Sequence, residues 1–388
     1  MSGIVLSAAV RQNLLSLQST AALLATTQNA LATGNKVNSA LDNPTNFFTA
    51  SGLNNRASDI NNLLDSIGNG VQVLQAANTG ITSLQKLVDT AKSIANQVLQ
   101  APTGYTTKSA TTSSVLPAGS TSANLVDGVA IKSGEIISIA ATTGIPAFTI
   151  TLTASESLAQ LNTSLAASNL TASLNSTNQL VITTTNDAAS STIGAVALTG
   201  TAGTATFSVA AAPVADPVSQ ATRASLVGQY NNIITQITTT AQDSSFNGIN
   251  LLNGDNLKLT FDETAKSTLN ITGVTYNAGG LGLSSLTVGT DFLDNNSANA
   301  ALAVLGTAST TLRTEASALG SNLSVVQLRQ DFNKNLINVL QTGASNLTLA
   351  DANEEAANSQ ALSTRQSIAV SALSLANQSQ QSVLQLLR

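Results

Sequence analysis

The 388-residue sequence contains no cysteine, no histidine and no tryptophan, and aromatic residues make up only 3% of it. Without cysteine and histidine there is no disulfide, no thiolate nucleophile, no Ser-His-Asp triad and no zinc site of the usual kind. Scarce aromatic side chains also disfavour one large globular core, because such cores take much of their buried area from aromatic residues. The composition therefore predicts aliphatic packing along helices, no enzymatic activity and no cofactor.

Charge is scarce as well, since 15 basic and 20 acidic residues give a net charge of −5. No cluster of Lys and Arg offers the basic face that phosphate contacts require, so nucleic acid is excluded as a partner. We interpret the adjacent acids Asp262–Glu263 and Glu354–Glu355 as solvated surface rather than as a calcium site or an acid–base pair. The sequence thus predicts no catalytic, cofactor-binding or metal-binding residues.

Long hydrophobic runs are missing too. No stretch reaches the ~18 uninterrupted apolar residues of a transmembrane helix, so we expect no membrane insertion. Residues Met1 to Val10 have no Lys or Arg before an apolar segment, so no secretory signal peptide is expected. Export from the cell would need another route.

The sequence does contain helical periodicity, and it lies toward both ends. Apolar residues recur there at steps of three and four, which is typical of a coiled-coil seam. The N-terminal seams comprise Val10, Leu14, Leu17, Leu24 and Leu31, then Leu53, Ile60, Leu64, Ile67, Val71, Leu74 and Ile81. The C-terminal seams comprise Leu312, Leu319, Leu323, Val326, Ile337 and Leu340, then Leu362, Ala369, Leu373, Ala376, Val383 and Leu387.

These seams have two interpretations. One is a helical bundle within the chain. The other is association between copies, which we favour because a single pair of such long helices cannot cover its own apolar arcs.

The middle of the chain has a different composition, dense in Thr, Ser, Ala and Gly. Short apolar runs bounded by Gly, Asn, Asp or Pro predict strands there. The expected strands are 135–141, 147–153, 179–185 and 204–210, with a helix at 157–167, and beyond them a helix at 220–240 and a hairpin at 257–274.

Three segments carry a resemblance to a known family. They are Leu31–Gln85 with its NSALDNP turn, FNGINLLNG at Phe246–Gly254, and Ala352–Arg388, which ends in ANQSQQSVLQLLR. All three are similar to bacterial flagellin, in the order found in that family.

The resemblance implies a mainly α fold with a β-rich insert, elongated and layered, in which the terminal helices form a coiled coil. Under it, the first and last seams form the inner core and contact each other and neighbouring copies. The implied segments are 1–39 (N-terminal inner-core helix), 40–100 (N-terminal half of the outer core), 101–219 (surface-exposed variable domain), 220–300 (middle helix and hairpin), 301–347 (C-terminal long helix) and 348–388 (C-terminal inner-core helix).

The resemblance also implies a function: the extracellular subunit of the flagellar filament, exported unfolded by a type III apparatus and polymerised at the tip into a helical tube for swimming. Implied partners are other flagellin subunits, the filament cap protein, hook-junction proteins and an export chaperone. One departure concerns Leu84–Gln97, which lacks the Arg and Glu of flagellins detected by a Toll-like receptor. We expect innate-receptor recognition to be weak.

Two alternatives stay open. A hook–filament junction protein has similar helical ends, although the extent of the match at both ends favours flagellin. A secreted coiled-coil adhesin would use the insert to bind a host ligand, but such proteins usually carry a signal peptide or a membrane-anchoring barrel.

Overall fold

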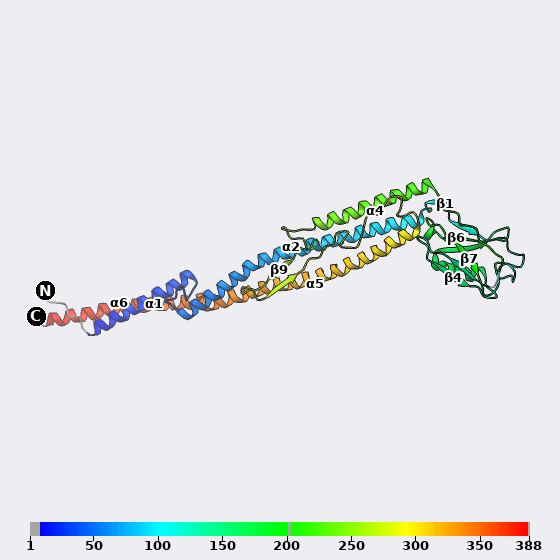
Figure 1. The fold of residues 1–388 in the computed structure, drawn as a ribbon. Helices are drawn as coiled ribbons and strands as arrows, with labels where there is room; N and C mark the ends of the chain where they lie inside the picture. Colours follow the sequence, from blue (N-terminus) through cyan, green and yellow to red (C-terminus); the bar gives the residue numbers. More distant parts are fainter. Residues whose placement is uncertain (1–7, 201–202, 387–388) are drawn as a thin grey trace. The chain divides into compact units, whose positions relative to one another are not determined.

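The computed structural model describes residues 8–200 and 203–386, and Figure 1 traces the chain. Long helices occupy both terminal regions, and most strands lie between the second and fourth helices. The fold is therefore mainly α with a β-rich insert, as the sequence predicts. The helices are α1 (Ala8–Thr33), α2 (Pro44–Gln100), α3 (Leu158–Leu165), α4 (Pro217–Asp243), α5 (Asn295–Thr348) and α6 (Ala352–Leu386).

Local sequence signals set the helix ends. Gly34, with φ of +73°, follows the last residue of α1, where a left-handed residue ends the helix at least cost. Proline occupies the first position of both α2 and α4, which fits because that position needs no amide hydrogen bond. The preceding residues act as caps: Asn43 accepts from the amide of Asn46, and Asp216 accepts from the amide of Val218.

The insert contains two three-stranded antiparallel sheets and a short strand pair at its base. One sheet has the order β2-β6-β5 and the other β4-β3-β7, while β1 pairs with β8. A core of aliphatic side chains from both sheets and α3 fills the insert, including Ile137, Leu161 and Ile182. The strands are β1 (Tyr105–Thr107), β2 (Ala110–Thr112), β3 (Ile136–Ile139), β4 (Phe148–Thr151), β5 (Leu170–Leu174), β6 (Leu180–Thr184), β7 (Val196–Thr199) and β8 (Val214–Ala215).

Most of the local expectations for the insert are confirmed. The predicted strands at 135–141, 147–153 and 179–185 correspond to β3, β4 and β6, and the predicted helix corresponds to α3. The strand expected at 204–210 is wrong: this segment holds only an isolated bridge between Phe207 and Ser113. Ala205, Phe207 and Ala210 instead pack on the insert core from a loop, so a short apolar run was mistaken for a paired strand.

Beyond α4, the chain forms β9 (Leu257–Thr260) and β10 (Thr268–Ile271), which are hydrogen-bonded neighbours in a two-stranded sheet. This confirms the expected hairpin. The preceding FNGINLLNG segment is a turn fixed by Asn250, whose side-chain amide donates to the carbonyls of Ala241 and Gln242 at 2.8 Å each. The last residues of α4 are thereby tied to the turn.

Two compact units make up the chain. The first, called unit 1 below, comprises Met1–Gly70, Lys258–Leu269 and Val325–Arg388; the second, unit 2, comprises Val71–Leu257 and Asn270–Ser324. Unit 1 contains α1, α6, the start of α2 and the end of α5. Unit 2 contains the insert, α4 and the remaining parts of α2 and α5. The segment boundaries expected from sequence remain a prediction.

Candidate association surface

Helices α1 and α6 of unit 1 lie side by side (Figure 1). On α1, the inward face follows steps of three and four through Val10, Leu17 and Leu24, with Thr20, Thr27 and Ala30 buried between or after them. The hydroxyl of Thr20 donates to the carbonyl of Ser16 at 2.8 Å, so it adds no unpaired polar group to the contact. The seam is therefore half aliphatic and half threonine or alanine.

Predicted inner-core residues fall into two groups. Val10 is buried and Leu17 and Leu24 are half-buried, whereas Leu14 and Leu31 lie at the edge of the contact and are exposed. On α6, the half-buried positions repeat at the same spacing and include four predicted residues: Leu362, Ala369, Leu373 and Ala376. Val383 lies in α6 but its side chain is outside the described residues, and Leu387 is wholly outside them.

Helix α6 buries few of its side chains in the single chain. None of its side chains from Ala352 to Ser379 is fully buried. Ile368 and Leu375 are 65% and 69% exposed, although they are large and apolar. They are seven residues apart and thus share one face of the helix. A 35-residue helix with this pattern lacks the burial that stabilises most protein helices.

The predicted outer-core residues are largely covered within the chain. In unit 1, Ile60 packs with Ile337 and Leu340, and Leu53 and Leu64 flank this cluster. The other predicted outer-core positions outside this cluster are also covered: Leu323 is half-buried, and the rest are buried. The remaining buried positions are Ile67, Val71, Leu74, Ile81, Leu312, Leu319 and Val326. These seams therefore support the intramolecular interpretation, in contrast to α6.

A second stripe on α5 was missed from the sequence. Val325, Leu328, Phe332 and Val339 are all exposed, Leu328 by 71% and Phe332 by 55%. Steps of three, four and seven place them on one face of α5, within unit 1. We define these four residues as the α5 stripe. The signal was present as a second apolar series beside the buried one at Val326, Ile337 and Leu340.

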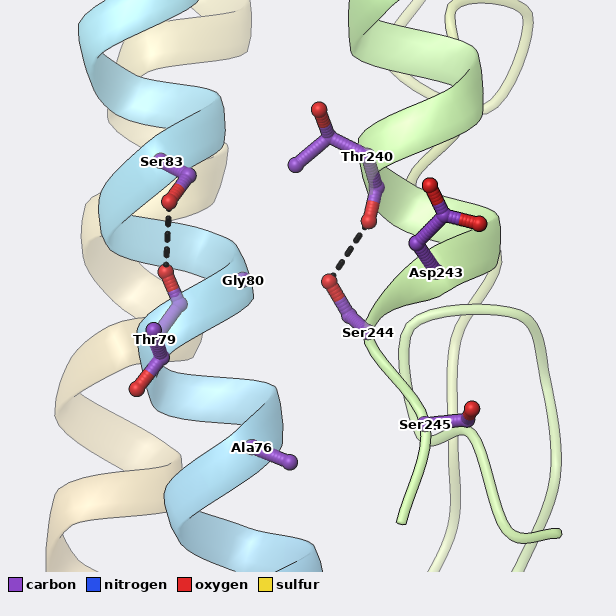
Figure 2. Close-up of a pocket in the computed structure, with 8 residues that line it drawn as sticks. All are labelled: Ala76, Thr79, Gly80, Ser83, Thr240, Asp243, Ser244 and Ser245. Atoms are coloured by element: carbon purple, nitrogen blue, oxygen red, sulfur yellow. Dashed lines mark hydrogen bonds between the residues drawn. The ribbon is translucent and has the colours of Figure 1, made fainter.

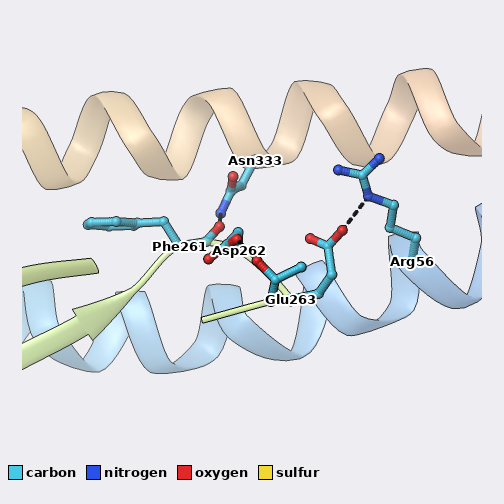
Figure 3. Close-up of polar contacts among 6 residues, drawn as sticks. Arg56, Phe261, Asp262, Glu263 and Asn333 are labelled. Atoms are coloured by element: carbon cyan, nitrogen blue, oxygen red, sulfur yellow. Dashed lines mark hydrogen bonds and ion pairs between the residues drawn. The ribbon is translucent and has the colours of Figure 1, made fainter. Parts of the chain in front are cut away.

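The β9–β10 hairpin covers a different face of this part of α5 (Figure 3). Asn333 donates its side-chain amide to the carbonyl of Phe261 at 2.9 Å, and the guanidinium of Arg329 lies 5.7 Å from the Phe261 ring centroid. Arg56 of α2 pairs with Glu263 at 2.5 Å, also shown in Figure 3. The hairpin thus contacts both long helices of unit 1 and leaves the α5 stripe uncovered.

The loop between α1 and α2 presents the exposed side chain of Leu41, and the first turns of α2 present that of Phe48. Asp42 orders this loop by accepting hydrogen bonds from the amides of Ser39 and Asn38, which lower the pKa of its carboxyl group. This ordered loop and the start of α2, each with a large apolar side chain in solvent, are a further part of the candidate association surface in unit 1.

A groove in unit 2 does not have the character of a ligand site. Its volume is about 440 Å³, and α2 and the end of α4 line it, as Figure 2 shows. The hydroxyls of Ser83 and Ser244 donate to backbone carbonyls of their own segments. Gly80 faces Ser244 and Leu252 so closely that an added Cβ would come within 2.7 Å of Leu252 Cδ1. Small and hydroxyl-bearing residues make up the lining of the groove, and Asp243 is the single charged residue among them.

Metal-binding and membrane-spanning features are missing from the described ranges 8–200 and 203–386. These ranges contain no group of three or more acidic residues placed to hold a metal ion. None of their helices has the length and apolarity needed to span a bilayer.

The geometry defines a helical protein whose two terminal helices pair while exposing large apolar faces. Comparison with known families gives a more specific class. Residues 5–115 match the family model of the bacterial flagellin N-terminal helical region, and residues 302–387 match that of the C-terminal helical region. Together these matches cover about half of the chain. The chain belongs to the bacterial flagellin family.

Individual relatives agree. The chain is 34% identical over 167 residues to Flagellin FljM and 32% identical over 167 residues to Flagellin FljO, both of Caulobacter vibrioides (strain ATCC 19089 / CIP 103742 / CB 15). Each match covers 42% of this chain and 59% of the relative. This chain is also 39% identical over 90 residues to Flagellin A of Rhizobium meliloti (strain 1021), and that match covers 23% of each of the two chains. The chain thus spans about three fifths of the length of the first relatives.

Proposed function

We propose that this chain is a structural subunit of the bacterial flagellar filament, located outside the cell and assembled from many copies for swimming motility. One observation carries the proposal: α6 and the α5 stripe present large apolar side chains that the single chain leaves in solvent. Burying a Leu or Phe side chain contributes roughly 1.5–3 kcal/mol, so several such residues per subunit supply a strong drive to polymerise. Membership of the flagellin family supports the same assignment.

The role is mechanical rather than catalytic. With no histidine and no cysteine, the chain lacks a thiolate nucleophile and the imidazole that most often serves acid–base catalysis at neutral pH. We extend the proposal to the partners that flagellins need: neighbouring subunits, a cap protein at the growing tip, hook-junction proteins at the base and an export chaperone.

Seeded polymerisation tests the proposal. Purified monomer is mixed with short filament seeds, and growth is followed by sedimentation and electron microscopy. We expect the full chain to form tubes and the chain lacking Leu362–Arg388 to stay monomeric, because the deletion removes most of α6. Circular dichroism and thermal unfolding of the truncated chain serve as the control for folding. Tubes formed equally well without these residues would contradict the proposed role of α6.

Abundance separates the filament subunit from the hook–filament junction alternative. A filament subunit is the main component of sheared filaments, whereas a junction protein forms only a short collar. Quantitative mass spectrometry of sheared filaments therefore distinguishes them, and a trace amount of this chain would favour the junction role.

A further inference from the structure

Arg223 is the largest fully buried side chain of the described residues, with 0% exposure. It lies on α4 in unit 2 and forms none of the ion pairs that the described residues contain. Its guanidinium donates instead to six oxygens. A buried charge is costly unless hydrogen bonds satisfy it, so this arrangement calls for a specific reason.

Three of these oxygens belong to the last turn of α2 and the two residues that follow it. The Nε atom donates to the carbonyl of Pro102 at 2.6 Å, and Nη2 donates to the carbonyls of Val98 and Ala101 at 3.0 and 2.9 Å. Carbonyls at a helix C-terminus lack partners within the helix and carry partial negative charge. Arg223 therefore caps α2 just before the chain enters the insert at β1.

The other three oxygens belong to the turn just before α5 and to its first residue. Nη1 donates to the carbonyls of Phe292 and Asp294 at 2.6 and 3.3 Å, and Nη2 donates to Asn295 Oδ1 at 3.3 Å. Phe292 is held at a φ of +61°, a strained backbone conformation for a bulky residue. Its ring is fully buried against Tyr230, with centroids 5.8 Å apart. The strain persists because packing and Arg223 fix the turn.

Asp294 connects this turn to the insert. One carboxylate oxygen caps α5 by accepting from the amide of Ser297 at 3.1 Å, and the other accepts from the hydroxyl of Ser190 at 2.5 Å. Ser190 lies between β6 and β7 in the insert. The amide of Gly104 also donates to the carbonyl of Leu293 at 3.1 Å. The turn before α5 therefore contacts the insert at its entry and at an internal loop.

We infer that Arg223 and Asp294 form a clasp that fixes the insert in one orientation on the helical part of unit 2. Arg223 joins the end of α2 to the start of α5, and Asp294 joins that start to Ser190. Both are positioning residues. The inference does not depend on polymerisation, so it can be tested on the monomer.

Distance measurements between two spin labels test the clasp. The chain has no cysteine, so Ser176→Cys in the insert and Thr307→Cys on α5 provide the sole labelling sites, and both side chains are exposed. Pulsed electron spin resonance on the monomer then gives the distribution of distances between the insert and the helix. We expect a single narrow distribution in the otherwise native chain.

Clasp variants are compared in this background. Arg223→Met and Ser190→Ala should each broaden or split the distribution, because the first releases the turn and the second releases the insert from it. Arg56→Met is the matched control, since Arg56 is a half-exposed arginine in unit 1, and it should leave the distribution unchanged.

If circular dichroism shows that Arg223→Met has lost helix, Ser190→Ala and Arg223→Lys decide the test. Lysine keeps the charge but lacks the planar fork of donors, so it should also broaden the distribution. A broad distribution in the native background, or an unchanged narrow one in the folded clasp variants, would overturn the inference.

Discussion

Small polar residues shape this protein at the scale of single side chains. Thr20 and Thr27 occupy buried positions in the contact between α1 and α6, where a coiled coil ordinarily has Leu or Ile. Threonine buries less apolar area than leucine, so each such position contributes less to the contact. The pairing of the two terminal helices within one chain is correspondingly weak, which leaves assembly to supply additional burial.

Asp127 shows how a single carboxylate orders a loop of the insert. It accepts from the hydroxyl of Ser120 and from the amides of Val129, Ala130 and Ile131. Burial acts to raise the pKa of Asp127, but these hydrogen bonds outweigh it and hold the pKa below its ordinary value.

A pH dependence follows from this lowered pKa. The stabilisation from Asp127 is present above the unfolded-state pKa of about 3.9 and is lost as pH falls through the lower folded-state value. We expect Asp127→Asn to lower the free energy of unfolding by about 1 kcal/mol at neutral pH, with a difference that shrinks in strong acid. Thermal melts of both proteins across this range measure it. A difference that stays constant into strong acid would contradict the assignment.

At the scale of elements, α5 has faces with different roles. One face is buried against α2 within unit 1, through Ile337 and Leu340. A second contacts the β9–β10 hairpin through Asn333. A third carries the exposed α5 stripe. The hairpin contact leaves the α5 stripe free for other contacts.

The Asn333 contact yields a stability prediction. Asn333→Ala leaves the carbonyl of Phe261 without its buried donor, which should destabilise the protein by about 1–3 kcal/mol. Asn335→Ala is the matched control, because Asn335 lies on the same helix and is exposed, and it should change stability by about 0.5 kcal/mol or less. Urea unfolding measures both. Equal effects of the two substitutions would show that the hairpin contact contributes little.

At the scale of the whole molecule, the α5 stripe predicts how assembly can be weakened without unfolding the chain. Phe332→Lys places a charge where a neighbouring copy would bury an aromatic ring. Lost burial of roughly 1.5–3 kcal/mol corresponds to an increase in the critical concentration for polymerisation on the order of tenfold or more. Sedimentation after seeded growth measures that concentration.

Gln327→Lys is the control for this substitution, since it adds the same charge at an exposed polar position of α5. Both variants should melt at the same temperature as the native chain. If Phe332→Lys polymerises like the control, the α5 stripe is not part of the contact between copies.

The sequence by itself indicated where the long helices lie, because apolar spacing acts locally. Their ends were less exact: the helix expected at 220–240 is α4 at Pro217–Asp243. The resemblance at both ends was specific enough to give the family. Strands were harder to predict: β3, β4 and β6 were found, whereas the short β1, β2 and β8 and the strands β5 and β7 were not proposed. A strand depends on a partner that is distant in sequence, and Thr-rich segments differ little from loops in composition.

Only the tertiary structure decided which apolar seams remain exposed to solvent in the single chain. Two parallel series on α5 look alike in sequence, yet Ile337 is buried against α2 and Phe332 is exposed, because partner placement is not a local property. The role of Arg223 could not be predicted from the sequence for the same reason. Its partners near residues 98–102 and 292–295 come together only when α2, α4 and α5 pack around it.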